Sequence, residues 1–150
     1  MSTMSTLSFS ARAVALQMLY ALDGGAEYSL DGALPLLRSV LLSEGDECLA
    51  SLDDFDDAVP LVRNVIESRE ALDETIRRHS RNWRLERMAQ LDRNLLRLML
   101  YLAQENPAGQ SESVQSVQSV IDDAGELARS FGTAESVAFV TGLLERCLAK

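Results

Sequence analysis

Hydrophobic residues recur every three or four positions along most of the chain, which is the spacing of an amphipathic helix. The pattern predicts seven helices, which begin near Ser8, near Leu30, at Asp53 or Asp54, near Leu72, just after Trp83, at Ser111 and at Thr133. No run alternates apolar and polar residues as a half-buried strand would. The sequence therefore predicts an all-α fold, a compact bundle of about seven helices joined by mostly short connections.

The same pattern indicates which residues end or bend the helices and which residues face inward. Pro60 is expected to kink the third helix or to delay its start. The fifth helix is expected to bury Met88 and the leucines that follow it, and the sixth to bury Phe131 at its end. Gly132 should then follow the sixth helix, with Thr133 as the cap of the seventh.

A length of 150 residues with 47% apolar residues favours one folded domain with a real core. We expect residues 1–7 to be a disordered tail and residues 8–150 to form that single domain. The start of the chain has neither the basic nor the apolar region of a signal peptide, and the chain has no apolar run of 18 residues. A soluble cytoplasmic protein that does not span a membrane is therefore expected.

The charge is distributed unevenly along the chain. The formal net charge is −9, and residues 23–57 hold ten acids and one base, which is the whole excess. Residues 77–97 hold seven arginines against two acids. An acidic protein repels nucleic acid at long range, so any RNA contact needs a local basic patch or backbone N–H groups. The arginines of 77–97 are either such a patch or, as we favour, helix-surface charges and ion-pair partners.

The residue types that support catalysis or cofactor binding are scarce. The two cysteines, Cys48 and Cys147, and the single histidine, His79, cannot form a four-ligand zinc site or a disulfide framework. No phosphate-binding or dinucleotide-binding glycine motif is present. The sequence therefore predicts a protein that is not an enzyme and that needs no cofactor.

A group of acids in the sixth predicted helix is the only other candidate for a metal site. Asp122, Asp123 and Glu126 lie within five residues, but adjacent side chains on a helix point about 100° apart and do not converge. We therefore expect these acids to pair with Arg93 or Arg97 rather than to bind a metal ion.

Three stretches together resemble the NusB family of transcription antitermination factors. They are the opening helix at 11–20, the segment Asn82-Trp83-Arg84 to Leu98, and the segment from Ile121 through the Phe-Gly corner to Leu144. Their order and spacing agree with the family from about residue 10 to 148. The resemblance implies an all-helical fold of two small packed bundles.

The resemblance also implies partners and site residues. Members of the family bind a small ribosomal-subunit protein, NusE, and with it the boxA element of ribosomal leader RNA, and the complex joins RNA polymerase so that transcription passes terminators. Carried over by position, the RNA-side candidates are Arg12, Gly132, Thr133, Glu135, Ser136 and Phe139. The candidates for the protein partner are Tyr20, Arg84, Arg87, Tyr101 and Leu102.

Several of these positions have a structural alternative. The start of the last helix offers free N–H groups to a phosphate, although Ser136 can equally be only a turn residue. Phe139 can stack on an unpaired base or lie in the core. Tyr20 and Tyr101 can face the partner or be half-buried core tyrosines.

The chain also departs from the family pattern on its polar side. The arginines that usually enter the first helix are replaced by Ser8-Phe9-Ser10, so Arg12 alone remains, and a basic position before Phe139 is Ala138. Two other functions therefore stay open. The chain could be a NusB-like protein-interaction module that has lost RNA binding, or a homo-oligomer such as a homodimer.

Overall fold

The computed structural model describes residues 8–23, 29–41, 52–80, 84–104 and 117–148. They form α1 (Phe9–Asp23), α2 (Leu30–Leu41), α3 (Leu52–Glu67), α4 (Arg69–His79), the short 3₁₀ turn η2 (Leu85–Arg87), α5 (Gln90–Gln104), α6 (Val117–Phe131) and α7 (Ala134–Leu148). No strand occurs in these ranges, so the predicted all-α fold is confirmed. The predicted tail, Trp83 and the helix start at Ser111 lie outside them.

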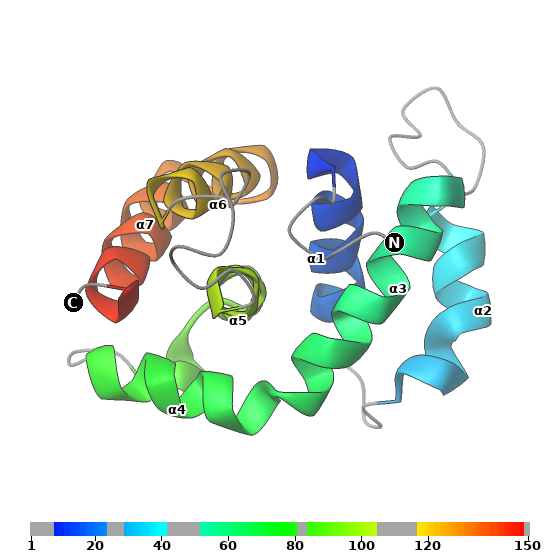
Figure 1. The fold of residues 1–150 in the computed structure, drawn as a ribbon, viewed down its shortest axis with the longest axis horizontal. Helices are drawn as coiled ribbons and strands as arrows, with labels where there is room; N and C mark the ends of the chain where they lie inside the picture. Colours follow the sequence, from blue (N-terminus) through cyan, green and yellow to red (C-terminus); the bar gives the residue numbers. More distant parts are fainter. Residues whose placement is uncertain (1–7, 24–28, 42–51, 81–83, 105–116, 149–150) are drawn as a thin grey trace.

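The seven helices pack as two groups that share one central helix. Helices α1, α2 and α3 contact one another on one side, and α4, α6 and α7 surround α5 on the other (Figure 1). Helix α5 contacts both groups, because it packs against α1 and α3 as well as α4, α6 and α7. The expected arrangement of two small packed bundles is therefore confirmed, with α5 as the element that joins them.

Helix α5 is central because all of its residues from Asn94 to Leu102 are buried. Leu95, Leu96, Leu98, Met99 and Leu100 are each at most 1% exposed. A helix that is buried on every face must be covered by other helices, and its buried polar residues need polar partners. Burying such a side chain contributes roughly 1.5–3 kcal/mol relative to leaving it in water, so this helix anchors the core.

Three helices begin at hydroxyl residues that cap their free backbone N–H groups. Ser8 Oγ accepts a hydrogen bond from the Ala11 N–H at 3.0 Å, and Ser29 Oγ accepts one from the Gly32 N–H at 3.2 Å. Thr133 Oγ1 accepts one from the Ser136 N–H at 3.1 Å, which confirms the predicted cap of the last helix. Each cap satisfies one of the N–H groups that a helix start leaves without an intrahelical acceptor.

The structure corrects three details of the predicted helices. Helix α5 begins at Gln90, later than expected, because the preceding residues form η2 and then an extended link in which Met88 is still buried. Helix α3 begins at Leu52 and continues past Pro60, so this proline does not delay its start. Phe131 was expected to face inward, but its side chain is 38% exposed.

The lengths and compositions of the helices bear on the membrane prediction. None of the helices in the described ranges is long and apolar enough to cross a bilayer.

Candidate functional site

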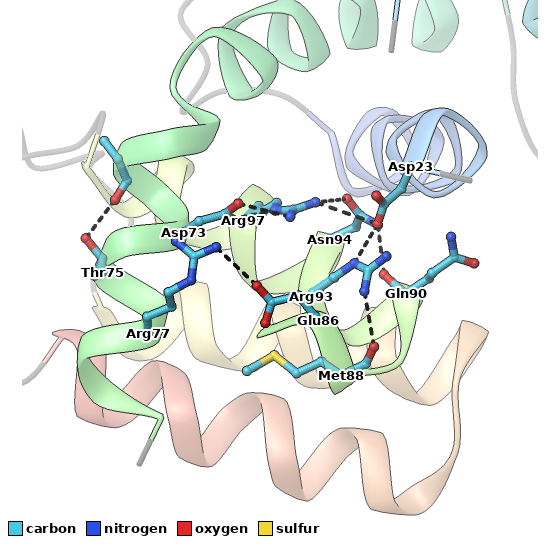
Figure 2. A network of polar contacts seen from close by, with 11 residues as sticks. Asp23, Asp73, Thr75, Arg77, Glu86, Met88, Gln90, Arg93, Asn94 and Arg97 are labelled. Carbon is cyan, nitrogen blue, oxygen red and sulfur yellow. Dashed lines mark hydrogen bonds and ion pairs between the residues drawn. The ribbon is translucent and has the colours of Figure 1, made fainter. Parts of the chain in front are cut away.

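A buried polar network joins α1, α4 and α5 at the centre of the molecule (Figure 2). Arg97 donates from Nε at 2.7 Å and from Nη2 at 3.1 Å to the two carboxylate oxygens of Asp73, and from Nη1 to Asn94 Oδ1 at 3.0 Å. Asn94 Nδ2 and Arg93 Nε both donate to Asp23 Oδ2, at 2.8 and 2.7 Å. The expectation that arginines in 77–97 act as ion-pair partners is therefore confirmed for Arg93 and Arg97.

The same network fixes the segment that leads into α5. Arg93 Nη1 donates a hydrogen bond to the Met88 carbonyl oxygen at 3.4 Å, at the end of η2. Burial by itself raises the pKa of Asp23, but the hydrogen bonds from Arg93 and Asn94 and the charges of Arg93 and Arg97 outweigh it, so its pKa is lowered. Asp23 is therefore held as a carboxylate, and it keeps Arg93 in place over Met88.

Arg12 and Asp123 form a second ion pair, between α1 and α6. The Arg12 guanidinium donates to Asp123, and Arg12 is only 5% exposed. This contact corrects the expectation that the acids of α6 pair with Arg93 or Arg97. The same contact places Arg12 inside the protein, where it joins α1 to α6. Arg12 is the only arginine that remains of the group expected at the start of the first helix.

A pocket opens at the N-terminus of α7, where most of the RNA-side candidates meet. Its volume is about 320 Å³, and we call it the helix-tip pocket. Its lining comes from the end of η2, the start of α5 and the first turns of α7, and consists of Arg87, Met88, Ala89, Asp92, Thr133, Glu135, Ser136 and Phe139. The structure therefore brings together four predicted RNA-side residues with Arg87, which was predicted to face the protein partner.

A chain of hydroxyl groups connects the cap of α7 to Asp92 in this pocket. Thr133 Oγ1 lies 3.4 Å from Ser136 Oγ, and Ser136 donates a hydrogen bond to the Asp92 side chain. Asp92 is only 9% exposed, and its Oδ1 has no hydrogen-bond partner in the described part of the chain. Burial raises the pKa of Asp92, and the Ser136 hydrogen bond offsets only part of that effect.

Gly132 lets the corner between α6 and α7 pack closely against α5. Its N–H donates to the Ala128 carbonyl at 2.7 Å, so it ends α6 as predicted. A Cβ added to Gly132 would lie 2.7 Å from Leu91 Cδ2, 2.9 Å from Ser136 Oγ and 3.0 Å from the Ala128 carbonyl oxygen. The absence of a side chain is therefore what allows this approach, and it positions Ser136 beside Asp92.

Replacing Asp92 with Asn is expected to stabilise the protein at neutral pH. A raised pKa means that the native state holds this proton more tightly than the unfolded chain, so ionising Asp92 costs stability as the pH rises through that range. Asp92→Asn removes the charge with little change of shape. Thermal unfolding should therefore give a higher Tm for the variant near pH 7, and a smaller difference at about pH 4, where an ordinary carboxyl group is half protonated.

Asp122→Asn is the matched control for this prediction, because Asp122 is an exposed carboxylate on α6. Its unfolding temperature should follow that of the wild type at both pH values. A lower Tm for Asp92→Asn near pH 7 would contradict the view that the Asp92 charge is costly.

A second, apolar depression lies on the other side of the α6–α7 corner, and we call it the Tyr20 groove. Its volume is about 510 Å³, and α1, α2, α5 and α6 supply its lining of Leu16, Gln17, Tyr20, Ala21, Leu36, Leu37, Val40, Leu91 and Phe131. Leu36 is 68% exposed and Val40 is 59% exposed. Exposed apolar side chains gathered in one groove are typical of a protein-binding surface.

The structure separates the residues that were predicted to bind the protein partner. Tyr20 is exposed and lines the Tyr20 groove, whereas Arg84 and Arg87 are exposed at η2, near the helix-tip pocket. Tyr101 and Leu102 are buried, because α5 is enclosed by other helices on all sides. These two residues therefore belong to the core and are not available to a partner, which corrects their assignment.

Sequence analysis missed the residues that complete both surfaces. Leu36 and Val40 extend the apolar character of α2 beyond the inward stripe of Leu30 and Leu37, and this wider stripe is a signal that periodicity could have revealed. Asp92 gives no such signal, because a single acid at a helix start is ordinary in a sequence.

Among the described residues, no group of three or more histidine, cysteine or acidic side chains is arranged to hold a metal ion. The Cys147 thiol is half-buried, and burial raises its pKa to about 11, so it is a poor nucleophile. The described residues form two surfaces on which a ligand could bind, the helix-tip pocket and the apolar Tyr20 groove.

Known proteins match this chain along nearly its whole length. The profile of the NusB family matches residues 10–149. Transcription antitermination protein NusB of Sorangium cellulosum is 40% identical over 136 residues, covering 90% of this chain and 86% of the relative. The protein of the same name from Carboxydothermus hydrogenoformans is 38% identical over 135 residues, covering 90% and 88%.

Solved structures have the same fold. T. maritima NusB aligns with a TM-score of 0.69 at 26% identity, covering 98% of this chain and 92% of that one. A crystal structure of antitermination factors NusB and NusE in complex with double-stranded RNA gives a TM-score of 0.68 at 20% identity, with 93% of each chain covered. Together with the family match over residues 10–149, these likenesses show that the chain belongs to the NusB family.

Proposed function

We propose that this protein is a transcription antitermination factor that binds NusE and boxA-type leader RNA and so joins the RNA polymerase antitermination complex. The observation that carries the proposal is the match over about nine-tenths of the chain to relatives named transcription antitermination protein. The protein acts in the cytoplasm, where transcription takes place, and residues 8–150 act as one domain. The mechanism is assembly, with no covalent step.

The position of the two surfaces supports a joint binding mode. Leu91 and Phe131 line the Tyr20 groove, whereas Asp92 and Thr133 line the helix-tip pocket. The two depressions therefore flank the same corner. A protein seated in the groove would lie next to RNA held at the pocket, and both ligands could contact each other.

The charge of the chain explains why a partner would be needed. The net charge is −9, and Arg12, Arg93 and Arg97 are engaged in interior ion pairs. A protein that is acidic overall repels phosphates at long range, and electrostatic attraction supplies much of the affinity of RNA-binding proteins. A basic partner such as a ribosomal protein would supply that attraction, while the groove would supply the apolar contact.

The helix-tip pocket supplies the direct contacts to RNA in this proposal. Thr133 Oγ1 caps the Ser136 N–H, but the two N–H groups before it in α7 have no intrahelical acceptor, and together with the positive end of the helix dipole they favour an anion. Phe139 is half-buried and lines the pocket, where one ring face could stack on an unpaired base. Single-stranded RNA, whose bases can be splayed out, fits such a site better than a duplex.

The proposal is tested by titrating a fluorescent boxA-type single-stranded RNA with the protein, alone and with NusE present. NusE should tighten RNA binding about 5- to 150-fold, the usual range of coupling between two ligands. Leu36→Asp should weaken NusE binding at least tenfold and abolish the gain, because it places a charge in the apolar groove without disturbing the core.

Leu52→Asp is the matched control, because Leu52 is 47% exposed at the start of α3 and does not line the groove. It should leave NusE binding unchanged. If NusE binds but RNA affinity does not rise, the chain is a protein-interaction module that has lost RNA binding, an alternative favoured by the burial of Arg12. If neither ligand binds, the proposed function is wrong.

A further inference from the structure

Asp92 places an unsatisfied hydrogen-bond acceptor in the helix-tip pocket. The residue is nine-tenths buried, Ser136 donates a hydrogen bond to its side chain, and Oδ1 has no hydrogen-bond partner among the described residues. A buried acceptor without a donor costs roughly 1–3 kcal/mol, so native proteins rarely keep one without a use. The pocket therefore favours a ligand that carries an N–H donor.

The residues that line the pocket limit which chemical groups the ligand can carry. Phe139 contributes an aromatic surface and Met88 a thioether, so the body of the occupant is flat or apolar. Glu135 is exposed at the rim and adds a second carboxylate, which also favours donor groups. Arg87 lines the same pocket and disfavours a cationic side chain such as that of lysine or arginine. A nucleobase whose edge carries an amino group meets all of these conditions.

Among the RNA bases, only uracil lacks an exocyclic amino group. Cytosine carries its amino group at N4, adenine at N6 and guanine at N2, and carboxylates accept hydrogen bonds from such groups in known protein–nucleic acid contacts. Bases read in this way are splayed out of a single strand and stacked on an aromatic side chain. The start of α7 lies beside Asp92 through the hydroxyl chain of Thr133 and Ser136, where its N–H groups can hold the adjoining phosphate.

We propose that the helix-tip pocket selects an unstacked base with an exocyclic amino group, which donates a hydrogen bond to the Asp92 carboxylate. Asp92 is then a specificity-determining residue, and the inference rests on the proposed function insofar as RNA is the ligand. At one position of the RNA, this hydrogen bond favours cytosine, adenine or guanine over uracil. The cost of the unsatisfied carboxylate in the free protein is recovered when the amino group enters.

The experiment compares labelled single-stranded RNAs in which one base at a time loses only its amino group. Inosine replaces guanosine, purine riboside replaces adenosine, and 2-pyrimidinone riboside replaces cytidine, and each affinity is measured with NusE present. At one position the wild type should lose about tenfold in affinity, the effect of one hydrogen bond to a charged group. Asp92→Ala should reduce that loss to less than about twofold.

Asp122→Ala is the matched control, because it removes the same charge from an exposed position on α6. It should keep the tenfold discrimination of the wild type. Asp92→Ala removes an unsatisfied buried carboxylate, so it is expected to fold, and circular dichroism checks this.

The outcomes separate the inference from the proposed function. If the parent RNA binds but no position depends on an amino group, or if Asp92→Ala keeps the full discrimination, the inference is wrong and the proposed function stands. If Asp92→Ala weakens NusE binding and leaves base preference unchanged, Asp92 faces a donor on the protein partner and the inference is again overturned. If the wild type binds no RNA with NusE present, the proposed function itself fails.

Discussion

Arg97→Met is expected to lower the free energy of unfolding by about 3–5 kcal/mol and the Tm by roughly 6–20 °C. Arg97 is buried, and it donates two hydrogen bonds to Asp73 and one to Asn94. Met has a similar length but leaves the Asp73 carboxylate buried without its cation. The cost is mainly that of the stranded charge, and chemical denaturation monitored by circular dichroism measures it.

Two further variants test the origin of this cost. The double variant Arg97→Met with Asp73→Leu should be more stable than Arg97→Met alone, because no buried carboxylate remains at that site. Arg77→Met is the matched control on α4, since its pair with Glu86 at 3.6 Å is exposed on both sides, and it should change stability by less than about 0.5 kcal/mol. A loss of under about 1 kcal/mol for Arg97→Met would mean that the network contributes little.

Gly132→Ala is expected to destabilise the protein by about 1–3 kcal/mol, the usual cost of overpacking a tight contact. The new methyl group would lie 3.0 Å or less from Leu91 Cδ2, Ser136 Oγ and the Ala128 carbonyl oxygen, and the last of these is backbone that cannot rotate away. The variant should also weaken RNA binding, because displacing Ser136 disturbs the helix-tip pocket. Urea denaturation and RNA titration measure the two effects.

Gly142→Ala provides a control with the opposite sign. Gly142 lies within α7, and an added Cβ would meet nothing within 4 Å. Alanine is a better helix former than glycine, so this variant should gain about 0.5–1 kcal/mol. Equal effects from the two substitutions would show that close packing at Gly132 is not what requires glycine there.

The helical periodicity of the sequence predicted the all-α fold and most of the buried faces of its helices. The stripes of α1 and α5 and the cap at Thr133 follow from local rules that act within one or two helical turns. The exposure of Phe131 could not be predicted, because it depends on how α6 meets α1 and α2 across the Tyr20 groove. The hydrophobic pattern of one helix does not show whether a neighbouring helix is placed so that it covers a given side chain.

The site was less predictable than the fold for the same reason. The resemblance placed Thr133, Ser136 and Phe139 at one helix start, and these residues do share a pocket. The pairing of Arg12 with Asp123 joins residues 111 positions apart, so helical periodicity could not predict it, and Arg93 or Arg97 was wrongly expected as the partner of that acid. Asp92 became a candidate only through its burial and through its Oδ1, which has no hydrogen-bond partner among the residues that the structure describes.

The interior positions of Arg12, Arg93 and Arg97 also change what the composition implies about the charge on the surface. The basic residues of 77–97 were expected to act mainly as helix-surface charges and ion-pair partners, and Arg93 and Arg97 do neutralise Asp23 and Asp73 inside the protein. The charge seen by an approaching polyanion is therefore set by exposed groups, which include the acids at the start of α3. Salt should weaken RNA binding mainly through the contacts that the partner supplies.

Leu91 and Asp92 are consecutive on α5, but Leu91 lines the Tyr20 groove and Asp92 lines the helix-tip pocket. On either side of Gly132, Phe131 lines the groove and Thr133 lines the pocket. A ligand that binds in one of these depressions would restrict the motion of the backbone that forms the other. Thermodynamic reciprocity then requires that RNA strengthen the hold on the protein partner by the same factor by which the partner strengthens the hold on RNA. In the proposed complex, bound RNA would therefore also stabilise the association with NusE.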